Sequence, residues 1–196
     1  DYYIAGNGVS TYDLMDTITA DTVKVNAIAI GAIFLVLLFT TKSILLPLLL
    51  VIGIETAVWM NLSVPYFKDS IVFYISYLII SSIQLGATVD YAILFTDRYM
   101  EFRKKMNKKQ AVIETVSSVT VSVITSGSVL AVVGFLLGYI SSHGVLSQLG
   151  MFLGIGSLFS MIIVLFVLPG LLYLCDRLIQ HTTLKTNFYQ DRKEIG

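Results

Sequence analysis

The chain has 196 residues, of which 56% are apolar and only 13% are charged, and its mean hydropathy is +0.81. Soluble domains carry about 25% charged residues, so this composition excludes an ordinary soluble domain and indicates a membrane protein. The formal net charge is zero, which argues against a nucleic-acid partner because phosphate binding depends on an excess of Lys and Arg.

The first 22 residues form a polar segment that we expect to end an extracytoplasmic domain. The stretch DYYIAGNGV at residues 1–9 predicts a strand end followed by a turn. Residues 10–25 place apolar side chains near a helical period, and Ser10 with Asp13 fits a capping box. Segment 1–22 should therefore lead into a membrane helix. Because the chain opens on Asp and not on Met, we expect it to be a piece of a longer protein.

Apolar runs long enough to cross a hydrocarbon core of about 30 Å occupy residues 23–41, 44–62, 71–97, 117–140 and 147–175. The predicted fold is therefore an all-α membrane protein, with a five-helix transmembrane domain over residues 23–178 and a cytoplasmic tail at 179–196. Residues 107–116 predict a short helix on the inner membrane surface, in which Asn107 is the N-cap and Gln110 its capping-box partner.

Basic residues indicate how the helices are oriented. Only Lys24 and Lys68 lie on one side of the predicted membrane, and the remaining basic residues lie on the other: Lys42, Arg98, Arg103, Lys104, Lys105, Lys108, Lys109, Arg177, Lys185, Arg192 and Lys193. The positive-inside rule makes the second side cytoplasmic and the N-terminal end extracytoplasmic. The run after the third helix could also bind lipid head groups, although a solvated positive-inside signal accounts for it.

Asp90 lies in the third apolar run, within SSIQLGATVDYAILFTDRY, at about 10 Å from the boundary that Asp97 marks. A charge at the bilayer centre costs about 2.5–3.5 kcal/mol, so an acid at this position indicates a specific functional or structural role. A carboxyl in lipid favours its neutral form and could take up a proton and release it when its surroundings become wetter. Gly86 and Ala87 share its helix face and would let another helix approach. The alternative is a structural hydrogen bond that never titrates, which Asn or Ser could make more cheaply.

Hydroxyl side chains recur at helical spacing along the fourth run, at Thr115, Ser118, Ser122, Thr125 and Ser126. A single hydroxyl in such a helix usually bonds back to its own backbone or joins two helices. Together with Asp90, the hydroxyls of Ser122, Thr125 and Ser126 predict a path for protons.

Glu55 is a second carboxyl inside an apolar run. It could support the same relay, and a structural or gating role is equally open. Two glycine pairs, Gly134 with Gly138 and Gly150 with Gly154, have the small-xxx-small spacing of closely packed membrane helices. No phosphate loop, metal-ligand spacing or Ser/His/Asp arrangement stands out in the sequence, so we expect neither an enzyme nor a metal or cofactor, only protons as coupling ion.

The motif QLGATVDYAILFTDRY resembles the Asp-Tyr helix of the resistance-nodulation-division (RND) superfamily, in particular its MMPL branch. YIAGNG, TTKSILLPLLL, KKQAVIETV and LPGLLYL follow in the order of that family. The resemblance implies the last five helices of one half of an RND transporter, a block similar to a sterol-sensing domain, after the end of a porter domain. A short tail favours the C-terminal half. Asp90 and Tyr91 would then form half of a proton relay and face their counterparts in the other half.

The resemblance predicts an exporter in the plasma membrane of a bacterium, driven by the proton-motive force, that moves hydrophobic or amphipathic substrates such as lipids or drugs. Its expected partners are membrane lipids, the substrate and the other half with its porter domains. Two alternatives stay open, a sterol- or lipid-sensing module and a Sec-associated accessory transporter.

Overall fold

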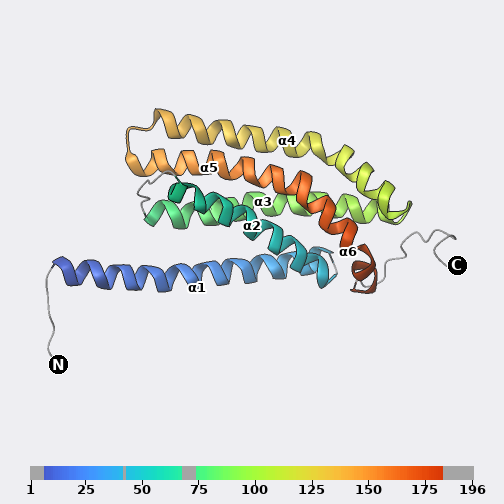
Figure 1. Cartoon of the computed structure of the whole chain (residues 1–196), viewed down its shortest axis with the longest axis horizontal. Coiled ribbons are helices and arrows are strands. Elements are labelled where there is room, and N and C mark those ends of the chain that lie inside the picture. The colour runs from blue at the N-terminus through green and yellow to red at the C-terminus, as the bar shows by residue number, and fades with distance from the viewer. Residues whose placement is uncertain (1–6, 42, 68–73, 183–196) are drawn as a thin grey trace, which may run out of the picture.

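A computed structural model describes residues 7–41, 43–67 and 74–182, and its described residues are almost all helical (Figure 1). Within these ranges, five helices are long and apolar enough to cross a membrane. In chain order the elements are α1 (Asn7–Thr41), α2 (Leu45–Phe67), α3 (Tyr74–Arg103), α4 (Lys108–Ile140), α5 (Gly144–Ile162), the π-helical turn η1 (Ile163–Val167) and α6 (Leu168–Thr182).

Consecutive long helices run in alternating directions, with α4 and α5 at one edge of the bundle and α1 at the other (Figure 1). One end of the bundle holds the α1–α2 turn, the α3–α4 turn and the end of α6, and the exposed Lys104, Lys105 and Lys109 lie there. We call it the basic end, and we call the end with the α4–α5 turn the opposite end. Apolar contacts between Leu37, Leu46, Phe95 and Leu172, all fully buried or nearly so, close the core near the basic end.

The first helix differs from its expected division. α1 is continuous from Asn7 to Thr41, so no break separates the segment before residue 23 from the apolar run after it. Residues 7–9 are helical and not part of a turn, and the strand expected before them falls outside the described residues. The helical spacing that begins at residue 10 therefore extends farther in both directions than the sequence indicated.

The helix predicted at residues 107–116 begins where expected and does not end there. The Asn107 side chain accepts a hydrogen bond from the Gln110 backbone N–H at 3.0 Å, which satisfies one of the free donors of a helix start. The helix then continues through residue 116 to Ile140 as α4. No Gly or Pro interrupts residues 108–126, so nothing in the local chemistry stops it.

The last predicted helix is divided by the π-helical turn η1. The Leu168 N–H donates to the Ile163 carbonyl, five residues back, and Pro169 follows directly. Proline has no N–H, and its ring would clash with the carbonyl four residues earlier in a regular α-helix. A widened turn relieves that clash, so Pro169 explains why α5 and α6 are separate elements.

Helices α4 and α5 meet along glycines. A Cβ added at Gly134 would collide with the backbone of Gly154, and one at Gly150 with the backbone of Gly138. Backbones this close leave room only for hydrogen atoms, and small residues permit such an approach in membranes. A Cβ at Gly86 on α3 would meet no atom within 4 Å, so Gly86 makes no contact between the described helices.

Candidate functional site

Asp90 lies near the middle of α3, on a face that the other described helices leave open. Its side chain is exposed, as are Ile83, Gly86 and Asp97, which share its helix face at spacings of three, four and seven residues. We call this the outward face of α3. Within the part of the chain that the structure describes, no hydrogen bond or ion pair to the Asp90 carboxyl is found. An unpaired carboxyl in an apolar span is costly, so this face is the first candidate site.

Tyr91 points away from that face. It is 9% exposed and belongs to the buried apolar cluster of the bundle. Adjacent residues of a helix point about 100° apart, so Asp90 and Tyr91 meet different surroundings. Of the two residues of the predicted relay, one is therefore outside the bundle and the other is inside it.

The hydroxyls of α4 are mostly bonded to their own helix. Thr115 donates to the Ala111 carbonyl at 2.6 Å, Thr125 donates to the Val121 carbonyl at 2.7 Å, and Ser118 donates to the Thr115 carbonyl at 3.0 Å. Ser122, Thr125 and Ser126 are exposed. Among the described residues, no hydrogen bond joins any of these three to Asp90, so the block alone does not assemble the predicted path.

Glu55 on α2 is half-buried, and its Oε1 atom is buried without a hydrogen-bond partner in the described part of the chain. Trp59 lies one turn farther along α2. No hydrogen bond joins Glu55 to Asp90 among the described residues.

A buried polar cluster at the basic end, which the sequence analysis missed, joins α3 to α6. Arg103 donates from Nε and Nη2 to the two carboxylate oxygens of Asp176, both at 2.9 Å. The Tyr99 hydroxyl donates to Asp176 Oδ1, and Gln180 Nε2 donates to Oδ2 at 2.9 Å. The Arg103 and Asp176 side chains are only 6% and 4% exposed. We call these four residues the Arg103 cluster.

The sequence carries a signal for this cluster. Arg103 is buried and is not the solvated positive-inside charge expected from the sequence, and it follows Tyr99 by four residues, which places both on one helix face. Asp176 is an acid inside the run LPGLLYLCDRLIQ. A carboxyl placed there suggests a cationic partner.

A second buried network, nearer the opposite end, joins α2, α3 and α5. Asn61 Nδ2 donates to Gln84 Oε1 at 2.8 Å and to the Phe152 carbonyl at 3.0 Å, and Gln84 Nε2 donates to the Ala57 carbonyl at 3.0 Å. The hydroxyls of Thr88 and Ser160 are 2.6 Å apart. We call this set the amide network. Uncharged amides lack the ionisation cost that marks a carboxyl in an apolar run, so the sequence alone does not single out Asn61 and Gln84.

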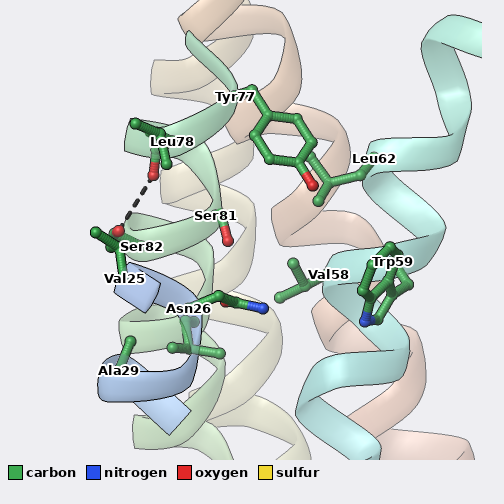
Figure 2. Close-up of a pocket in the computed structure, with 11 residues that line it drawn as sticks. Val25, Asn26, Ala29, Val58, Trp59, Leu62, Tyr77, Leu78, Ser81 and Ser82 are labelled. Atoms are coloured by element: carbon green, nitrogen blue, oxygen red, sulfur yellow. Dashed lines mark hydrogen bonds between the residues drawn. The ribbon is translucent and has the colours of Figure 1, made fainter. Parts of the chain in front are cut away.

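A small, partly open groove lies between α1, α2 and α3 on the side of the opposite end. In Figure 2, Asn26 extends from α1 toward Val58 of α2, and Tyr77 extends from α3 toward Leu62. Most of the lining is apolar, with a few polar groups such as Ser81 among it. Such a lining suits a molecule with a long apolar part and a small polar one. Across residues 7–41, 43–67 and 74–182, no group of three His, Cys, Asp or Glu side chains could hold a metal ion.

Comparison with known proteins agrees with this membrane architecture. Over 98 residues, the chain is 33% identical to a protein of Methanocaldococcus jannaschii that is named as a membrane protein, MJ1562, and the match covers 50% of this chain and 25% of the relative. The matched part of the chain thus spans about a quarter of the length of that relative. The model of the MMPL family matches residues 1–192. The chain belongs to the MMPL family.

Proposed function

We propose that this chain is the transmembrane block of a proton-driven exporter, in which Asp90 takes up and releases the coupling proton. One observation carries the proposal, which is the place of Asp90 on the outward face of α3, inside an apolar span and without a partner in the described block. The buried Tyr99, Arg103, Asn61 and Gln84 side chains bond to neighbouring helices. The Asp90 carboxyl is ionisable and has no such partner among the described residues.

The energy available to such a residue is adequate. One elementary charge that crosses 100 mV provides about 2.3 kcal/mol, enough to bias two conformations of similar free energy. The other half of the transporter would cover the outward face, as in RND relatives, and its own acidic residue would face Asp90. The open position at Gly86 would let a helix of that half come close.

The basic end would lie in the cytoplasm of a bacterial plasma membrane, because Lys and Arg are concentrated there. The N-terminal end of α1 would then lead to a porter domain outside. We propose a carrier and not an enzyme, and a hydrophobic or amphipathic substrate such as a lipid or a drug. The groove between α1, α2 and α3 opens at the level of the outer leaflet in this orientation, which supports a lipid-like substrate.

The proposal is tested with the full-length protein in vesicles of phosphatidylethanolamine and phosphatidylglycerol. A pH gradient is imposed, and proton uptake is followed with a trapped pH-sensitive dye. Asp90→Asn keeps the shape and removes the titratable group, so uptake should fall to the level of empty vesicles. The infrared band of a protonated carboxyl, seen as pH is lowered, should also be lost. Parent-like proton uptake by Asp90→Asn would refute the proposal.

The groove favours a second candidate function, a lipid-sensing module that binds a sterol or acyl chain without proton flow. A photoactivatable sterol or fatty acid should then label groove residues such as Leu62 equally in the parent and in Asp90→Asn. For the exporter, labelling should differ between the two proteins because the proton changes helix packing. Proton uptake in the first experiment decides between them, since a sensor needs none.

A further inference from the structure

Helix α3 is held by polar contacts at two levels along its length. Nearer the opposite end, Gln84 bonds to α2 and α5, and Thr88 bonds to Ser160 of α5 at 2.6 Å. At the basic end, Tyr99 and Arg103 bond to Asp176 of α6. Thr88 and Arg103 are about 22 Å apart along the axis. Asp90 lies between the two levels.

Both sets of contacts lie on the side of α3 opposite to Asp90. At about 100° per residue, Thr88 points roughly 160° away from Asp90, Tyr99 roughly 180° away, and Arg103 roughly 140° away. The burial agrees, since Thr88, Tyr99 and Arg103 are all buried. The contacts of Thr88, Tyr99 and Arg103 therefore determine the direction in which Asp90 points, although Asp90 takes no part in them.

The Arg103 cluster restrains rotation more strongly than an apolar contact would. Arg103 forms two parallel hydrogen bonds to Asp176, both at 2.9 Å, and this paired geometry is directional. Its Nη1 also donates to the Met106 carbonyl at 3.1 Å, in the turn that ends α3. Rotation of α3 about its axis would separate Arg103 from Asp176 and leave both charges buried and unpaired, whereas sliding apolar side chains past one another carries no such penalty.

We propose that Arg103 and Asp176 are positioning residues for Asp90, which fix the rotation of α3 so that α2, α3, α5 and α6 carry Asp90 outward as one rigid body. This inference rests on the proposed function for its meaning, because it matters only if Asp90 exchanges protons. The inference adds two points to that function. The movement that follows protonation occurs where the outward face of α3 meets the other half of the transporter, and α3 does not rotate within its own block.

The test removes the ion pair without leaving an unpaired charge. Arg103→Met combined with Asp176→Leu replaces both charged side chains by apolar ones of similar size, an exchange that buried ion pairs often tolerate. Arg103→Lys is the second variant, since it keeps the charge and loses the paired geometry. Arg98→Gln with Glu101→Gln is the matched control. It removes the other Arg–carboxylate pair of α3, at 2.9 Å, whose side chains are 51% and 46% exposed.

Rotation is measured in the full-length protein with spin labels at Ile83→Cys on the outward face of α3 and Leu158→Cys on α5, both of which are exposed. All native cysteines, Cys175 included, are replaced by Ala. The parent and the control should give one narrow distance distribution at both acidic and neutral pH. The paired variant should give a broad or two-peaked distribution, and Arg103→Lys should give an intermediate one.

The infrared band of the Asp90 carboxyl supplies a second readout that a merely structural role would leave unchanged. It should shift or broaden in the paired variant and stay parent-like in the control. An unchanged distance distribution in both cluster variants, or an unchanged carboxyl band despite a broadened distribution, would overturn the inference. If Asp90→Asn leaves the band in place, the proposed function fails instead, and the spin-label distances still decide whether the cluster fixes α3.

Discussion

The two faces of α3 use polar residues in opposite ways. On the inward face, Gln84, Thr88, Tyr99 and Arg103 each bond to a neighbouring helix. On the outward face, Asp90 has no such partner among the described residues. Polar groups in a membrane interior are either paired for stability or kept for function. The comparison teaches that the position of an acid on its helix, and not its mere presence in an apolar run, separates these two uses.

The largest contrast should come from removing a charge on each face. Arg103→Met leaves the Asp176 carboxylate buried without its cation, and breaking a buried ion pair costs about 3–5 kcal/mol. Asp90→Asn removes no contact within the block and should change the free energy of unfolding by less than about 0.5 kcal/mol. Reversible unfolding of both variants in mixed micelles measures the difference. Equal destabilisation would show that Asp90 is also a structural residue.

A buried glycine of α5 and an exposed glycine on the outward face of α3 give the next contrast. Gly150→Leu forces a side chain into the Gly138 backbone and should destabilise the protein by about 3 kcal/mol, at the upper end of overpacking effects. Gly86→Leu meets open space in this block and should leave its stability nearly unchanged. In the full-length exporter, however, Gly86→Leu should slow proton uptake because it would obstruct the covering helix. Melting temperature and proton uptake separate the two effects.

The amide network should show a smaller effect. Gln84→Leu removes the acceptor of Asn61 and the donor to the Ala57 carbonyl, and an unsatisfied buried polar group costs about 1–3 kcal/mol. Ser82→Ala on the exposed side is the control, because its hydroxyl only bonds back to the Leu78 carbonyl and its loss should be close to neutral. Unfolding free energies of the two variants test this, and a neutral Gln84→Leu would contradict the network.

The smallest effect is expected for a single hydroxyl pair. A double-mutant cycle of Thr88→Val and Ser160→Ala should give a coupling energy of about 0.6 kcal/mol, the average found for hydrogen bonds between membrane helices. Thr125→Val on α4 should be neutral for stability because its hydroxyl bonds only within its own helix. A coupling energy of zero would show that the 2.6 Å contact of Thr88 and Ser160 adds nothing.

The amino-acid sequence determined the class and the main helices of this protein by itself. Runs of apolar residues long enough to span a bilayer are a local property, because membrane insertion depends on the hydropathy of each segment. Asn107 as a helix cap is equally local. The sequence predicted the ends of these helices less well, because no Gly, Pro or capping residue has to mark the place where a helix could end. The helix that begins after Asn107 therefore continues through residue 116 as α4.

Only the tertiary structure decided which polar residues are paired. Asp90 and Asp176 are both acids in apolar runs, and hydropathy alone does not say which of the two has a buried partner. They differ because Arg103 lies 73 residues away from Asp176 in the chain and yet within hydrogen-bond distance in the fold, whereas no residue in the described part of the chain bonds to Asp90. Pairing depends on how helices pack side by side, and that packing is set by contacts between distant segments such as the glycines of α4 and α5.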